Sequence, residues 1–198
     1  MSVKGTERDA AFYDAKVLEV EHWTVHYTRS HYYPVWTVIA DRLRSSENGK
    51  VLDIGCGPGQ VGAMLAARGL DNYLGFDLSP GMVEQARRAC PEFEFRVGNI
   101  HESDVLETHD YDTVIMLEFL EHIEADLSVV ERIRPGTLIL GTVPNFPARS
   151  HVRHFKNVEE VRARYGGLIE DLDVSEILAS EFGTKFFVLQ GDRSDQGK

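Results

Sequence analysis

The 198-residue chain has no uninterrupted apolar run of about 18 residues, so it lacks the simplest signature of a membrane-spanning helix. Its N-terminus mixes both charges and has no apolar segment like that of a signal peptide. Cysteine is scarce: Cys56 and Cys90 are the only two, too few for a disulfide framework or a zinc site built from cysteine alone. These absences predict a soluble protein of the reducing cytoplasm.

Basic residues are also in short supply. The chain has 21 Lys plus Arg against 32 Asp plus Glu, a formal net charge of −11 at pH 7. Such a surface repels a phosphate backbone, so double-stranded nucleic acid is not an expected partner. The apolar share of 42% and the charged share of 27% are those of a globular protein, and 198 residues suit a single domain.

Short apolar runs alternate with amphipathic stretches along the chain. The spacing predicts helices over residues 60–68 and 80–89, and strands over 51–54, 73–76, 93–97, 113–117 and 137–143. This alternation predicts an α/β, Rossmann-like fold with a mostly parallel sheet and helices on both faces. Two further strands, within 169–178 and 184–190 and joined near Glu181-Phe182-Gly183, bring the sheet to seven. The region before Lys50 is expected to form two helical pieces.

The most informative segment is the glycine-rich turn Asp53-Ile54-Gly55-Cys56-Gly57-Pro58-Gly59 after the first strand. Glycine at alternate positions lets the backbone turn sharply and approach a ligand closely. Gly57, Gly59 and Gly62 also fit the dinucleotide pattern GxGxxG. A carboxylate at Asp53 would repel a pyrophosphate, however, and would attract the ammonium group of S-adenosylmethionine. The acid therefore favours a methyl donor over a dinucleotide.

With this loop, the stretch from about Lys50 to Asn145 resembles the class I S-adenosylmethionine-dependent methyltransferases. The resemblance implies that the loop wraps the methionine part of the cofactor and that Asp77, at the end of the second strand, accepts both ribose hydroxyls. It also implies that Met82 lies against the adenine and that Asn99 bonds the adenine amino group. The residues assigned to the cofactor here are Asp53, Gly55, Cys56, Gly57, Gly59, Asp77, Leu78, Met82, Asn99 and Ile100.

Acidic residues and histidines follow the fourth expected strand. If the segment there is helical, Glu118, Glu121 and His122 share one face, which suits cation binding or proton transfer. A later loop carries His151 and His154, and in a parallel sheet both loops emerge at the same edge. Glu118 also borders the expected cofactor cleft. The catalytic candidates are His122, His151, His154 and Glu118.

The pattern E-x-x-E-H followed by H-x-x-H is similar to two subgroups of the family. These are the quinone-biosynthesis O-methyltransferases and the metal-dependent methyltransferases that act on the terminal ribose of small RNAs. The second resemblance implies a divalent cation, Mg²⁺ or Mn²⁺, held by Glu118, Glu121, His122 and one of His151 or His154. A bound cation lowers the pKa of an acceptor hydroxyl and positions its oxygen. A mechanism without metal needs only alignment and a histidine base, and both alternatives stay open.

Aromatic residues crowd a short stretch before the first strand. Trp23 and Tyr27, then Tyr32 and Trp36, recur at a helical spacing that suits packing of helices on the sheet. The same stretch could form a lid over the cofactor, with Tyr27 and Tyr32 lining the pocket, since aromatic faces suit a sulfonium.

The expected function is transfer of a methyl group from S-adenosylmethionine to a small-molecule hydroxyl or amine. Arg149 and Arg153 give the loop after the fifth strand local positive charge, which suits an anionic acceptor. The alternatives are a metal-dependent RNA 2′-O-methyltransferase and a catalytically silent module that keeps the cofactor pocket. The single domain is expected to comprise a helical lid segment (1–48), a cofactor-binding core (49–145) and a substrate-side loop with C-terminal strands (146–198).

Overall fold

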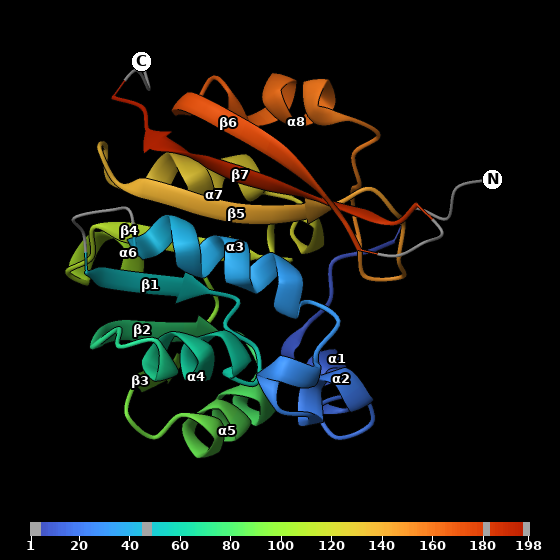
Figure 1. The fold of residues 1–198 in the computed structure, drawn as a ribbon, viewed down its shortest axis with the longest axis vertical. Coiled ribbons are helices and arrows are strands. Elements are labelled where there is room, and N and C mark those ends of the chain that lie inside the picture. Colours follow the sequence, from blue (N-terminus) through green and yellow to red (C-terminus); the bar gives the residue numbers. More distant parts are fainter. Residues whose placement is uncertain (1–4, 45–48, 180–182, 196–198) are drawn as a thin grey trace. The chain divides into compact units, whose positions relative to one another are not determined.

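The structure, a computed structural model, describes residues 5–44, 49–179 and 183–195. The chain divides into two compact units (Figure 1). One comprises residues 9–103, and the other comprises residues 5–8 together with residues from 104 onward. Each unit is described by itself below.

The unit of residues 9–103 is built on three parallel strands. They are β1 (Lys50–Ile54), β2 (Asn72–Asp77) and β3 (Glu94–Val97), in the order β3-β2-β1. Helix α4 (Gln60–Ala67) follows β1 and helix α5 (Pro80–Ala89) follows β2, as the sequence predicts. Parallel strands require such crossover helices. The loops that lead into α4 and α5 therefore lie at the carboxyl ends of β1 and β2.

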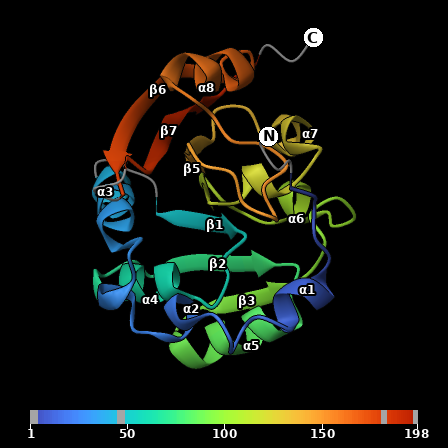
Figure 2. The same cartoon turned by 90° about the vertical axis from the view of Figure 1, so that its right-hand side faces the viewer.

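The N-terminal part of this unit forms four short elements instead of the two helical pieces expected. They are α1 (Ala10–Asp14), α2 (Glu21–Thr24), the 3₁₀ turn η1 (Tyr27–Arg29) and α3 (Tyr33–Arg44). Extended backbone at Val20, Val25 and Ser30 interrupts the helical stretches, so the segment contains more pieces than the two expected. Helix α1 packs beside α5 (Figures 1 and 2).

The unit from residue 104 onward contains the other four strands. They are β4 (Thr113–Leu117), β5 (Leu138–Pro144), β6 (Ile169–Leu178) and β7 (Lys185–Arg193), in the order β4-β5-β7-β6. Strands β4 and β5 pair in parallel, whereas β7 runs antiparallel to both β5 and β6. The helices of this unit are α6 (Val105–Thr108), α7 (Asp126–Arg132) and α8 (Val158–Tyr165), of which α8 packs on β6 (Figure 1).

Seven strands are thus present among the described residues, each within a few residues of its predicted bounds. The pairings β1–β2, β2–β3 and β4–β5 are parallel, and β7 pairs antiparallel with β5 and β6, which confirms the predicted mostly parallel sheet. Residues Glu181 and Phe182, where the hairpin turn was expected, lie outside the described residues. None of the described helices combines the length and apolar character needed to cross a membrane.

Candidate active site

The glycine-rich turn leaves β1 in a left-handed backbone conformation. Gly55, Gly57 and Gly59 have φ angles of 79°, 52° and 78°. A Cβ atom on Gly59 would lie 2.7 Å from the Cα of Ala86 in α5, so this position needs glycine for space as well as for conformation. The turn is anchored to β2, because the N–H of Gly55 donates to the carbonyl of Phe76 at 2.8 Å.

The carboxylate of Asp77 ties the turn to the loop after β2. Its Oδ2 accepts from the Gly57 N–H at 2.9 Å, and its Oδ1 accepts from the Ser79 N–H at 2.9 Å. Burial raises the pKa of this carboxyl, whereas the backbone donors at Ser79 and Gly57 lower it. Each carboxylate oxygen has a second lone pair, so Asp77 can still accept two further hydrogen bonds such as those of a ribose diol.

Asp53 is almost completely buried at the end of β1. Only 2% of it is exposed, and the Tyr73 hydroxyl donates a short hydrogen bond to its Oδ2. Burial raises the pKa of Asp53 to about 7, the Tyr73 hydrogen bond lowers it, and the charge of Asp77 raises it. A buried carboxylate with one neutral donor attracts a cationic ligand group strongly.

Sequence reasoning missed Tyr73, because its contact with Asp53 depends on how β1 pairs with β2. Asp53 pairs with Gly75 across β1 and β2, and Tyr73 lies two positions before Gly75 on the same face of β2. Gly75 itself leaves no room for a side chain, since an added Cβ would lie 2.4 Å from the Phe95 ring. The register of β1 against β2, which the sequence does not specify, therefore decides that Tyr73 is the polar partner of Asp53.

The residues predicted for the adenine side belong to the same unit. Met82 and Ile100 are buried, with 3% and 5% exposed. The side chain of Asn99 is engaged within its own loop, where Oδ1 accepts from the His101 N–H at 3.0 Å and Nδ2 donates to Glu102 Oε1 at 3.2 Å. An adenine amino group would have to share the Asn99 carbonyl oxygen with that backbone donor.

The N-terminal aromatic residues form two groups of ring contacts. Tyr32 stacks on Trp36 with ring centroids 5.8 Å apart and also contacts His22 and His31. Tyr27 contacts neighbouring rings, at 4.1 Å from His26. Burial lowers the pKa of both His22 and His31, so both imidazoles are neutral at pH 7.

In the second unit, the segment after β4 is not the helix that would place its acidic residues on one face. Glu118 has a φ of 52°, and its N–H donates to Thr142 Oγ1 at 2.8 Å. A single 3₁₀ turn, η2 (Leu120–His122), then carries Glu121 and His122. Helical spacing failed here because the strand end is followed by a left-handed residue, which turns the chain sharply before η2 begins.

The turn nevertheless brings Glu121 and His122 to His151. The potential ligand atoms of these three residues lie within 4.8 Å of one another. The rings of His122 and His151 meet edge to face at 4.9 Å, and His122 Nε2 lies 3.8 Å from Glu121 Oε1. His122 Nδ1 faces the Ser150 carbonyl and His151 Nδ1 faces the Phe146 carbonyl, each at 3.0 Å. Carbonyl partners fix the proton on Nδ1 in both rings, so each Nε2 carries a lone pair.

Burial shifts the pKa values of the ionisable groups in this cluster. Burial raises the pKa of Glu121 to about 8, and burial together with the charge of Glu121 raises the pKa of Glu118. Burial and the neighbouring His151 lower the pKa of His122 to about 4. Apart from the neighbouring Glu118 carboxyl, which lowers the pKa of Glu121, neither carboxylate oxygen of Glu121 has a hydrogen-bond donor among the described residues. An orphaned buried carboxylate beside two imidazole lone pairs fits a divalent cation.

Two predicted residues have other surroundings. His154 lies outside the cluster and lines an open surface groove with Arg153 and Arg164. The Arg153 guanidinium donates to the carbonyls of Leu120 and Ile123 and lies 3.2 Å from buried Asp126. Arg153 therefore braces the η2 turn and has most of its donors occupied, which argues against a role for it in pairing with a substrate anion.

Comparison with known proteins finds similarity to methyltransferases. The sequence profile of a family described as a methyltransferase domain matches residues 51–135. The ubiquinone biosynthesis O-methyltransferase of Hydrogenovibrio crunogenus is 30% identical over 128 residues, which cover 61% of this chain and 53% of that protein. These similarities support a class I S-adenosylmethionine-dependent methyltransferase. It spans about half the length of the curated relatives it matches.

Solved structures agree with the class I methyltransferase fold. The 1,6-didemethyltoxoflavin-N1-methyltransferase of Burkholderia thailandensis superimposes with a TM-score of 0.69 at 17% identity, covering 98% of this chain and 94% of that chain. The [4+2]-cyclase SpnF superimposes with a TM-score of 0.72 at 12% identity, covering 96% and 98%. At these identities the likeness establishes the methyltransferase fold, and the second name shows that this fold also carries other chemistry.

Proposed function

We propose that this methyltransferase-family chain binds S-adenosylmethionine and transfers its methyl group to a hydroxyl or amine of a small molecule. The observation that carries the proposal is the buried Asp53 before three left-handed glycines, with Asp77 bonded to the same turn. A carboxylate at Asp53 suits an ammonium group and disfavours a pyrophosphate. The names of the ubiquinone O-methyltransferase and toxoflavin N1-methyltransferase relatives are consistent with small acceptors.

The proposed division of roles combines the family resemblance with the contacts seen in the unit of residues 9–103. Asp53 and the glycine turn bind the methionine part, Asp77 binds the ribose, and Met82 with Leu78, Asn99 and Ile100 surrounds the adenine. When bound, S-adenosylmethionine supplies a methyl group on a positively charged sulfur, which is already a good leaving group. The protein then has to align the acceptor and accept its proton.

His122 and His151 are the proposed proton acceptors. Their pKa values lie below the usual value, so both rings are neutral at pH 7 with Nε2 unprotonated. Burial raises the pKa of Glu121 beside them to about 8, so this carboxyl is mostly protonated at pH 7 and leaves both imidazoles neutral. His154 stays a weaker candidate because it is not part of this cluster.

A metal-dependent mechanism is the second candidate, and the compact cluster favours it. Glu121, His122 and His151 would hold the cation, with Glu118 next to Glu121. A divalent cation there would lower the pKa of an acceptor hydroxyl and fix its oxygen. An RNA acceptor is disfavoured, because a protein with a net charge of −11 repels the phosphates of RNA.

Ligand-dependent thermal melting tests the cofactor. S-Adenosylhomocysteine at 100 times its dissociation constant is expected to add about 2.7 kcal/mol to the free energy of unfolding. Stabilisation by NAD and none by the adenosyl ligand would refute the proposal.

A radiolabelled methyl-transfer assay over small hydroxyl and amine acceptors then tests catalysis, with short RNA as the competing acceptor. Each reaction is run with and without EDTA. Activity that survives EDTA removes the metal candidate, and activity on RNA alone replaces the small-molecule acceptor. Binding of the adenosyl ligand without transfer to any acceptor would indicate the catalytically silent alternative.

A further inference from the structure

The N-terminal segment of the cofactor-binding unit is fastened to the end of the glycine turn by one side chain. Gln60 is the first residue of α4, directly after Gly59, and only 8% of it is exposed. Its Nε2 donates to the carbonyl of His22 at 3.0 Å and to the carbonyl of Val25 at 2.6 Å. Both N–H bonds of the amide are therefore used by one short stretch of main chain.

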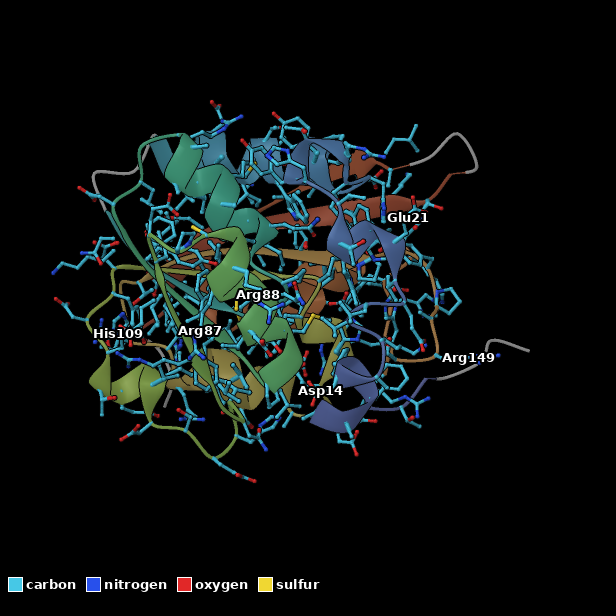
Figure 3. The ribbon with its side chains drawn as sticks, turned by 90° about the horizontal axis from the view of Figure 1, so that it is seen from below. Asp14, Glu21, Arg87, Arg88, His109 and Arg149 are labelled. Carbon is cyan, nitrogen blue, oxygen red and sulfur yellow. The ribbon has the colours of Figure 1, made fainter. Side chains whose placement is uncertain are left out.

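A second side chain fastens the same segment to the loop after β2. Asp14 is the last residue of α1, and its Oδ1 accepts from Ser79 Oγ at 2.5 Å and from the Gly81 N–H at 2.8 Å. Figure 3 shows Asp14 where α1 meets α5. The N–H of Ser79 also donates to Asp77, so only one residue separates this contact from the acid assigned to the ribose.

The segment between these two contacts has little order of its own. Elements α1, α2 and η1 contain five, four and three residues, which is too short for stable isolated helices. Their order depends on contacts with the rest of the unit, and the two side-chain contacts start at the loops that hold the cofactor. A ligand that orders these loops therefore also orders the segment, and linkage requires the converse.

We propose that Gln60 and Asp14 are positioning residues for the cofactor, which couple ordering of residues 10–32 to cofactor binding and so set its release rate. This rests on the proposed binding of S-adenosylmethionine. The two residues need not touch the cofactor, because they act through the Gly59 and Ser79 ends of its loops. Neither was among the residues that the sequence singled out.

Gln60→Glu tests the proposal with almost no change in size. The variant replaces the amide donor by a carboxylate that faces the carbonyls of His22 and Val25, so the contact becomes repulsive. Gln85→Glu makes the same chemical change on half-buried Gln85 of α5 and is the matched control. Asp14→Ala removes the second contact and leaves the Ser79 side chain capping α5 through the Met82 N–H.

Two measurements report on coupling. The first is the dissociation constant and release rate of S-adenosylhomocysteine, by calorimetry and stopped flow. The second is tryptic cleavage after Arg29, which is exposed at the end of η1, with and without that ligand. We expect wild type and the Gln85 variant to be protected by the ligand. Gln60→Glu and Asp14→Ala should lose protection and bind at least tenfold more weakly, mainly through faster release.

The outcomes separate the two proposals. If wild type does not bind S-adenosylhomocysteine, the proposed function fails. If wild type binds it, but Gln60→Glu keeps the same affinity, release rate and protection, only the coupling proposal is overturned. If Gln60→Glu does not fold, Gln60→Met removes the donors without adding a charge and decides the question by the same measurements.

Discussion

Replacing Asp53 by asparagine should stabilise the free protein while weakening its affinity for the cofactor. Asp53 is 2% exposed, and burial raises its pKa from 3.8 to about 7. The folded state therefore holds this proton more tightly than the unfolded chain. The carboxyl is neutral in both states below about pH 4, and the unfolding free energy falls as the pH rises from there through about 7.

The size of the effect follows from the difference between the two pKa values. About three pKa units correspond to about 4 kcal/mol, which is the largest loss expected for wild type above pH 8. Asparagine is neutral at every pH, and its Oδ1 can still accept from the Tyr73 hydroxyl. Asp53→Asn should therefore match wild type near pH 4 and exceed its stability progressively up to pH 8.

Cofactor affinity should change in the opposite direction. An ammonium group next to Asp53 favours the ionised carboxyl, so binding of S-adenosylhomocysteine to wild type should tighten as the pH rises through 7 and should release a proton. Asp53→Asn should bind roughly 10- to 100-fold more weakly, the range for loss of a charge-assisted hydrogen bond, with this pH dependence removed.

Urea unfolding between pH 4 and 8 and calorimetry between pH 5 and 8 measure the two effects. Tyr73→Phe is the matched control, because losing the hydroxyl donor raises the pKa of Asp53 and should move the midpoint of the affinity profile upward. Two results would refute the assignment of Asp53 as the buried carboxylate that binds the ammonium group. One is the same pH dependence of the unfolding free energy in wild type and Asp53→Asn, and the other is equal affinity of both for S-adenosylhomocysteine at pH 8.

Five other substitutions test the turn and the histidine cluster. Gly59→Ala should lower the free energy of unfolding by several kcal/mol because the added Cβ has no space. Gly57→Ala lies in open space and should lower it by only about 1–2 kcal/mol through backbone strain. Urea titration compares the two variants, and equal losses would contradict this prediction. Glu121→Gln should abolish Mn²⁺ binding measured by electron paramagnetic resonance without changing S-adenosylhomocysteine affinity, and unaltered Mn²⁺ binding would exclude Glu121 as a ligand. His151→Ala should weaken Mn²⁺ binding at least tenfold and His154→Ala should leave it unchanged; the reverse order would show that the cluster is misassigned.

The sequence alone determined the strands, their order along the chain and the nature of the glycine turn. Alternating strands and helices with short connections leave few ways to bury the apolar residues, so the bounds of β1, β4 and β6 were predicted closely. The turn at Gly55, Gly57 and Gly59 could also be predicted from the sequence, since its left-handed backbone conformation favours glycine at these positions.

Only the tertiary structure decided which polar side chains meet. Tyr73 and Asp53 come together through strand pairing, Gln60 reaches main-chain carbonyls 35 and 38 residues away, and His151 rather than His154 joins Glu121. A left-handed Glu118 replaced the expected helix, which periodicity could not reveal because a single residue sets the direction of the chain there. Local preferences fix elements, but contacts between residues distant in sequence depend on how those elements pack, and the chemistry of this chain depends on such contacts.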